Sequence, residues 1–100
     1  MNLESLRTHW LELMKKSLPN AAKSHKEWPI RLDHCFGRVI LDNVVGVDRP
    51  WTQKIKSPAY KNMTKEQLEQ AIELALQILN GTADLNELNI NSLKLRGKYS

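Results

Sequence analysis

The chain has 100 residues, of which 41% are hydrophobic and 26% are charged, with four glycines and four prolines. This balance is that of an ordinary globular protein and excludes collagen-like, low-complexity and wholly disordered chains. A chain of this length is expected to form one domain and to bury roughly two thirds of the surface exposed in its unfolded form, which is enough for one core without disulfides or metal.

Fifteen Lys and Arg residues against eleven Asp and Glu residues give a net charge of +4. Residues 1–27 carry five basic and three acidic groups, residues 28–63 carry six and three, and residues 64–100 carry four and five, so the excess lies in the first two thirds. This excess could attract an anionic partner, but a charge of this size also keeps small domains soluble, which is the preferred interpretation.

The single cysteine, Cys35, cannot form an internal disulfide, which favours a reducing, cytoplasmic setting. Residues 1–18 mix acidic side chains into their apolar pattern and do not form a signal peptide. No uninterrupted apolar run approaches the roughly 20 residues of a membrane span. The sequence therefore predicts neither a leader nor a membrane segment.

The first predicted element is an amphipathic helix that begins after Asn2, a suitable capping residue. Its apolar residues recur every three or four positions and are Leu3, Leu6, Trp10, Leu13, Met14 and Leu18. Pro19 lacks a backbone donor and is expected either to end this helix or to start another short turn. Residues 20–27 are expected to form a polar connection that can contain a turn of helix.

The second predicted element begins near Pro29, because proline suits the first turn of a helix. The apolar pattern that follows covers most of the helix circumference and comprises Leu32, Cys35, Phe36, Val39, Ile40, Leu41, Val44 and Val45. Such a helix belongs in the middle of a domain, and Gly46 suits its end. The β-branched residues would also suit a strand, but the length of the pattern favours a helix. Asn43, on the apolar side, is expected to hydrogen-bond to residues 47–63.

Residues 47–63 form a linking segment, after which Thr64 and Gln67 make a capping box. The helix that starts there has a buried stripe at Leu68, Ala71, Ile72, Ala75, Ile78 and Leu79, and Gly81 is expected to end it. Residues 85–95 predict one or two short helical turns, and residues 96–100 are expected to be a frayed tail.

The run from Arg31 to Arg38 contains an acid, an imidazole and a thiol in sequence, at Asp33, His34 and Cys35. Neighbouring helix positions point about 100° apart, so these side chains fan out, whereas a Cys–His nucleophile needs direct contact. Cys35 is therefore interpreted as a core residue. The alternative is a functional thiol whose pKa is lowered by the two arginines, each one turn away.

No motif points to a metal or a cofactor. The three histidines and the cysteine lack the spacing of a metal site, and the four glycines are isolated, so no phosphate-binding loop is present. We therefore expect neither a bound metal nor a cofactor.

Aromatic and basic side chains alternate in residues 49–61, where Trp51 and Tyr60 accompany Arg49 and Lys54. On a surface, such rings and cations can bind single-stranded nucleic acid or another anion. The preferred interpretation is that the rings hold the segment to the core while the lysines reach solvent. Ordered loops of this kind are nevertheless common places for binding sites.

Three stretches, WPIRLDHCFGRVILDN, AYKNMTKEQLEQAIEL and NSLKLRGK, together resemble a small family of uncharacterised microbial proteins of about this length. The resemblance spans most of residues 28–98. It implies a single free-standing domain and transfers no catalytic residue, because no activity is attached to the family.

The sequence thus predicts an all-α fold, a compact single domain of four or five helices around a buried helix that starts near Pro29. The predicted function is that of a small, cytoplasmic, non-catalytic binding module for a protein or an anionic ligand, with nucleic acid not favoured and no membrane partner. Its expected contact surface comprises Arg31, Arg38, Arg49, Trp51, Lys54 and Tyr60. The competing hypothesis is a small enzyme that uses His34 and Cys35, and a pocket holding both side chains would favour it.

Overall fold

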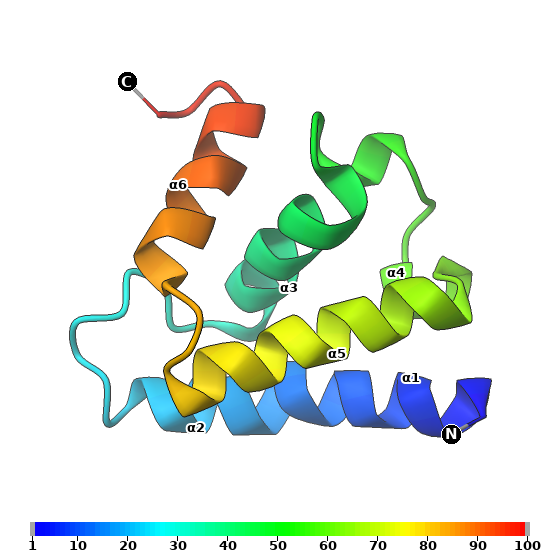
Figure 1. The fold of residues 1–100 in the computed structure, drawn as a ribbon, viewed down its shortest axis with the longest axis horizontal. Helices are drawn as coiled ribbons and strands as arrows, with labels where there is room; N and C mark the ends of the chain where they lie inside the picture. The colour runs from blue at the N-terminus through cyan, green and yellow to red at the C-terminus, as the bar shows by residue number, and fades with distance from the viewer. Residues whose placement is uncertain (1, 100) are drawn as a thin grey trace.

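The computed structural model describes residues 2–99, and every regular element in that range is helical, as the sequence predicts (Figure 1). The elements are α1 (Leu3–Glu12), the π-helical turn η1 (Leu13–Ser17), α2 (Leu18–Ala22), α3 (Asp33–Leu41), the π-helical turn η2 (Asp42–Gly46), the 3₁₀ turn η3 (Trp51–Gln53), α4 (Ala59–Asn62), α5 (Lys65–Asn80) and α6 (Leu85–Leu95). Because η1 joins α1 to α2 and η2 extends α3, these elements amount to five helical segments besides the short turn η3, and none of the helices described could span a membrane.

Of the two expectations for Pro19, the structure confirms that it starts a further short helix, α2, and not that it stops the chain from being helical. The Asn2 side chain caps the start by accepting from the Ser5 N–H at 2.8 Å. In η1 the Leu18 N–H bonds to the Leu13 carbonyl, five residues back, and Pro19 then falls in the first turn of α2. A proline in a first turn loses no hydrogen bond, so the segment continues to Ala22.

The central helix begins at Asp33 and not near Pro29, which corrects the predicted start. Arg31 explains the difference, because its guanidinium donates to the carbonyl of Ala22, the last residue of α2, and to that of Lys26 in the connection. These bonds hold the connection in a non-helical path that ends at Leu32, whose backbone is extended with φ and ψ of −102° and 151°. Leu32 is consequently 57% exposed and does not belong to the apolar face.

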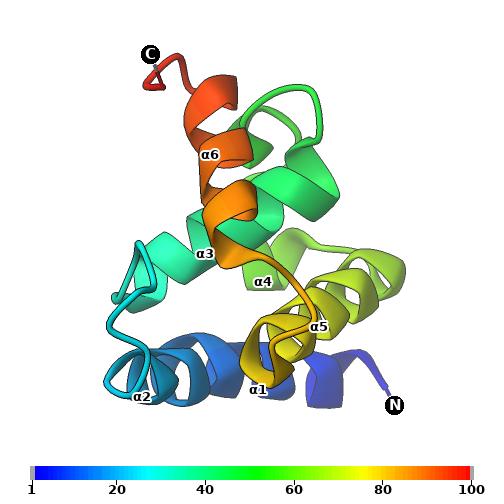
Figure 2. The ribbon, with the colours of Figure 1, turned by 60° about the vertical axis from the view of Figure 1, so that its left-hand side comes forward.

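The helix α3 lies in the middle of the molecule, as predicted. Figure 2 shows α3 between the α1–α2 segment on one side and α6 on the other. Phe36, Val39 and Ile40 on its inner face have no exposed surface. They join one core with the buried stripes of α1, η1 and α5, so the elements share a single hydrophobic cluster.

The α5 helix is capped as its sequence predicts. The Thr64 hydroxyl accepts from the Gln67 N–H at 3.1 Å, and the Gln67 side chain accepts from the Thr64 N–H at 2.9 Å. Gly81 ends the helix with a φ of +82°, a left-handed conformation that glycine adopts without strain.

The chain after α5 forms one full helix, α6 (Leu85–Leu95), where one or two short turns were expected, and Asp84 caps its start. Residues 96–99 are not a frayed tail. Gly97, with a φ of +67°, donates to the Lys94 carbonyl, and Lys98 donates to the Leu93 carbonyl, which closes the helix end. Residue 100 lies outside the described residues.

Replacing Thr64 with alanine removes the cap and leaves the Gln67 N–H without its partner. We expect Thr64→Ala to lower the free energy of unfolding by about 1 kcal/mol, measured by urea denaturation. Lys65→Ala is the matched control, since Lys65 is exposed at the next position and its change should stay within about 0.5 kcal/mol. Equal stability of Thr64→Ala and the unmodified protein would contradict the capping role.

Candidate binding groove

A groove of about 550 Å³ lies between the α1–η1 segment and α3. The connection that carries η3 and α4 contributes to its wall, and Arg96, just after α6, completes the lining. This volume falls in the range of about 300–1,000 Å³ that is typical of ligand sites. The groove therefore brings together residues from the beginning, the middle and the end of the chain.

The lining of the groove is mostly apolar. Trp10 and Met14 reach it from the helical stripe of α1 and η1, and Leu41 reaches it from α3; all three are buried parts of the core. Trp51 and Tyr60 are half-buried and bring aromatic surface from η3 and α4. The groove is thus a place where the hydrophobic core comes within reach of solvent.

Gly37 widens the groove in the middle of α3. A Cβ atom placed on Gly37 would meet nothing within 4 Å, and the backbone there does not have a positive φ. Neither packing nor chain conformation therefore requires glycine, although glycine inside a helix costs about 1 kcal/mol relative to alanine. The space that a side chain would fill belongs to the groove, which Gly37 lines.

Two cationic side chains in the groove have no carboxylate partner within residues 2–99. They are Lys15 of η1 and Arg38 of α3, and neither belongs to any ion pair in that range. Arg38 donates to neutral groups of α6, the Asn89 Oδ1 at 2.8 Å and the Ser92 Oγ at 3.3 Å. These bonds fix the guanidinium in place and leave its charge uncompensated.

Arg96 differs from these two cations because it is paired with Asp42, a fully buried carboxylate. Arg96 Nε donates to Asp42 Oδ2 at 2.7 Å and its Nη2 donates to Oδ1 at 3.1 Å. The Ser92 hydroxyl also donates to Oδ2 at 2.6 Å, and the Trp51 N–H donates to Oδ1 at 2.9 Å. One carboxylate at the start of η2 therefore ties both α6 and η3 in place beside the groove.

The environment of Asp42 favours its charged form. Burial on its own raises the pKa of this carboxyl, because desolvation penalises the charge. The hydrogen bonds from Arg96, Ser92 and the Trp51 amide, with the charge of Arg96, outweigh burial and hold the pKa of Asp42 below its ordinary value. Asp42 is therefore ionised at neutral pH and offsets the charge of Arg96.

Asp42 and Arg96 were missed by the sequence reasoning, which placed the polar anchor of this helix at Asn43. The expected bond from Asn43 to residues 47–63 is wrong, because its Nδ2 donates to the carbonyls of Val39 at 2.7 Å and Leu88 at 3.0 Å. Its Oδ1 accepts from Asn91 of α6 at 3.3 Å. The one available signal was an aspartate inside an otherwise apolar helical pattern.

Only three of the six residues of the contact surface expected from the sequence line the groove. Arg38, Trp51 and Tyr60 line the groove together. Arg31 does not, since its guanidinium is occupied by the carbonyls of Ala22 and Lys26.

Arg49 and Lys54 are also outside the groove lining, and both pair with Asp48. The Lys54 Nζ lies 2.8 Å from Asp48 Oδ1, and the Arg49 Nη2 lies 3.2 Å from Oδ2. Hydrogen bonds from these two cations lower the pKa of Asp48 to about 2. The single negative charge of Asp48 therefore offsets one of these two positive charges at the surface.

His34 and Cys35 do not share a pocket. The exposed imidazole of His34 lines the groove, with its Nδ1 3.4 Å from the Asp33 carboxylate. Cys35 is half-buried against the core, does not line the groove, and makes no hydrogen bond with His34. The arrangement thus lacks the direct contact that a Cys–His nucleophile needs.

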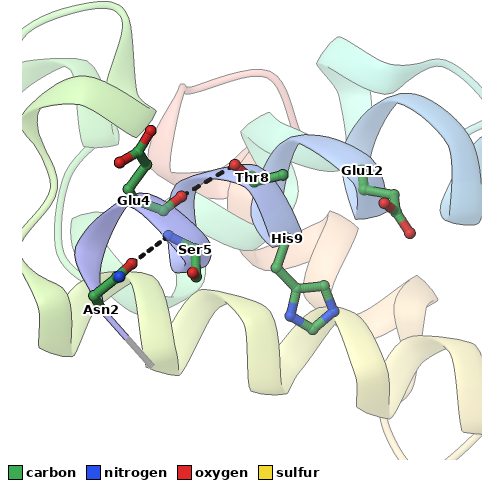
Figure 3. Close-up of a pocket in the computed structure, with 6 residues that line it drawn as sticks. All are labelled: Asn2, Glu4, Ser5, Thr8, His9 and Glu12. Carbon is green, nitrogen blue, oxygen red and sulfur yellow. Dashed lines mark hydrogen bonds between the residues drawn. The ribbon is translucent and has the colours of Figure 1, made fainter.

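A second hollow, shown in Figure 3, lies along the outer side of α1 and has no convergent chemistry. Its polar groups are used locally, since Asn2 accepts from the Ser5 N–H and the Thr8 hydroxyl donates to the Glu4 carbonyl. All six of its lining residues come from α1 or its cap: Asn2, Glu4, Ser5, Thr8, His9 and Glu12. It is the solvent face of one helix.

No group of three or more His, Cys, Asp or Glu side chains in residues 2–99 is arranged to hold a metal ion. In comparisons with known proteins, no family model matches this chain, and no curated protein or solved structure matches it either. The geometry and the charge of the groove are therefore the basis for proposing a function.

Replacing Asp42 with asparagine leaves Arg96 without its counter-charge. We expect Asp42→Asn to lower the free energy of unfolding at pH 7 by about 3 kcal/mol, the low end for buried pairs, because the Arg96 side chain keeps 23% of its surface exposed. The pKa of Asp42 is lower in the folded than in the unfolded state. Its stabilisation is therefore complete above an ordinary carboxyl pKa of about 3.9 and is lost as pH falls through the folded-state pKa.

Urea denaturation between pH 2 and pH 7 measures both effects, and the acid-dependent loss should be smaller in Asp42→Asn. Asp48→Asn is the matched control, because the pKa of Asp48 is also lowered but its ion pairs are at the solvent-exposed surface. We expect little change in stability for this control. If both variants were as stable as the unmodified protein at pH 7, Asp42 would not be the anchor described above.

Proposed function

We propose that this protein is a non-catalytic binding module whose groove takes an apolar ligand that carries a negative charge. The observation that carries the proposal is the combination, in one groove, of an apolar lining, a helical glycine with open space beside it, and two cations without carboxylate partners in residues 2–99. An apolar site with a few fixed polar groups is the usual composition of a ligand site.

The cations have complementary roles in this proposal. Lys15 is exposed and contributes long-range attraction, which speeds association with an anion. Arg38 is half-buried and held by Asn89 and Ser92, so it can bind a carboxylate or phosphate with little loss of side-chain freedom. Arg96 adds no net charge, because Asp42 neutralises it.

The competing enzyme hypothesis receives less support from the site. The groove holds His34 but not Cys35, and it offers no nucleophile in contact with the imidazole. Nucleic acid is also less favoured, because Arg49 and Lys54, which would follow a phosphate backbone, are paired with Asp48.

The remaining parts of the proposal come from the sequence. The lone thiol of Cys35 supports a reducing, cytoplasmic setting. The resemblance to a small microbial family supports a free-standing module of this length and assigns no residue a role.

The fluorescent probe 8-anilinonaphthalene-1-sulfonate, which is apolar and anionic, tests the proposal directly. We expect saturable binding of this probe to the native protein and weaker binding of its uncharged analogue N-phenyl-1-naphthylamine, because only the former can pair with Lys15 and Arg38. Lys15→Gln should weaken the sulfonate probe about threefold to fivefold and leave the neutral probe unchanged.

Two substitutions at one position separate groove binding from a change in the fold. Gly37→Leu should fill the groove and abolish binding of the probe. Gly37→Ala should keep binding and raise the free energy of unfolding by about 0.5–1 kcal/mol, because alanine fits the open space and favours the helix. Unchanged probe binding in a folded Gly37→Leu variant would refute the groove as the site.

A further inference from the structure

The groove continues beyond its rim along the first helical segment. A shallower hollow of about 260 Å³ lies on α1 and η1 and shares Leu11 and Lys15 with the groove. Thr8 and Lys15 in its lining are two helical turns apart, a distance of roughly 10 Å. The two hollows together are therefore elongated along a helix, with apolar side chains in the groove and, apart from the shared Leu11, polar and charged side chains in the outer hollow.

We propose, building on the proposed function, that the occupant of this surface is an amphipathic helix of a partner protein with acidic side chains beside its apolar face. A helix bound in a groove places apolar residues at i, i+4 and i+7 on the groove floor and leaves its outer face in solvent. An open, elongated groove suits that mode, whereas a small molecule needs burial of most of its surface. Trp10, Met14 and Trp51 offer the aromatic and thioether surface on which apolar anchors pack well.

The charges around this surface select an acidic helix. Lys15 lies where the two hollows meet, Arg38 lines the groove on α3, and Lys16 lines the outer hollow. None of these three forms an ion pair within residues 2–99, and Glu12 is the one carboxylate that lines either hollow. Acidic residues on the flank of a bound helix would therefore meet cations that are free to pair with them.

The acidic helix α5 of a second copy does not supply such a helix. The exposed side of α5 is acidic, with Glu66, Glu69 and Glu73, but its one exposed large apolar residue is Leu76, at 41% exposure. Its apolar stripe is already buried in the core of its own copy. The α5 face therefore has the charge but not the apolar anchors that the groove would bury.

The probe for this inference is a pair of short, fluorescently labelled helical peptides. The first carries Leu at i, i+4 and i+7 with Glu on both flanks, and the second is identical except that Lys replaces each Glu. We expect fluorescence anisotropy to show at least tenfold tighter binding of the acidic peptide to the native protein, and we expect added salt to weaken it. Equal binding of the two peptides, or binding of neither, would overturn the inference.

Charge exchange at Lys15 provides a second, independent measurement. Lys15→Glu should weaken the acidic peptide about tenfold or more and strengthen the basic one, because the exposed side chain changes sign at the groove rim. Lys26→Glu is the matched control, since Lys26 is exposed and lines neither hollow, and both affinities should stay unchanged. Peptide affinities that respond equally to the two variants would contradict a specific pairing with Lys15.

Two further results would assign the groove to another occupant and overturn the inference. Binding of decanoate, blocked by Gly37→Leu, without binding of the acidic peptide would indicate a small amphiphile; the proposed function would survive. Self-association in sedimentation velocity that Gly37→Leu abolishes would indicate a second copy. If 8-anilinonaphthalene-1-sulfonate does not bind to the native protein, in contrast, the proposed function itself is refuted.

Discussion

The buried carboxylate of Asp42 is the constraint on which the groove depends. It joins three segments that are far apart in the chain, because it accepts hydrogen bonds from the backbone of Trp51 and from the side chains of Ser92 and Arg96. Removing a carboxylate from water is costly, and here the cost is offset by a full set of donors and an opposite charge. The result is geometric: η3 and the end of α6 stay fixed beside α3, where Trp51 and Arg96 line the groove.

The backbone around η2 shows how closely this region is specified. A Cβ on Gly46 would lie 3.2 Å from the Trp51 nitrogen, so glycine permits the close approach of η3. The next residue, Val47, has a φ of +64°, a conformation that costs about 1–3 kcal/mol for a β-branched residue. Its N–H donates to the Asp42 carbonyl at 2.7 Å. The same residue, Asp42, thus holds both the strained turn and the segment that follows it.

The parts of the fold that were predictable from the sequence are those determined by near neighbours. The capping box of Thr64 and Gln67 and the apolar stripes of α1, α3 and α5 are set within a few residues of chain. The structure contains them, except that Leu3 and Leu32 are exposed. The start of α3 and the order of the chain after α6 depend on Arg31 and Arg96, which bond to groups 9 and 54 residues away. A sequence pattern has no information on such partners, so these features were predicted wrongly.

The candidate site was predictable only in part for the same reason. Arg38, Trp51 and Tyr60 were identified by residue type, and they do meet in the groove. The open space beside Gly37 and the position of Lys15 in the groove lining depend on how the first helical segment packs near α3. The composition of the sequence cannot show this packing. A glycine inside a helix, with no turn or close contact that requires it, is nevertheless a useful signal once a structure exists. Glycine destabilises a helix relative to alanine, so its presence there points to a role other than folding.

The positive charge of this protein becomes informative only after its ion pairs are known. A net charge of +4 is compatible with simple solubility, and most of the basic residues selected from the sequence turn out to be occupied. Asp42 neutralises Arg96, while Arg49 and Lys54 share Asp48, whose single charge offsets one of their two. The uncompensated cations beside apolar surface are then Lys15 and Arg38, in the same groove. Exposed apolar surface often marks an interaction site and uncompensated cations attract anions, so the proposed binding site rests on this juxtaposition and not on the total charge.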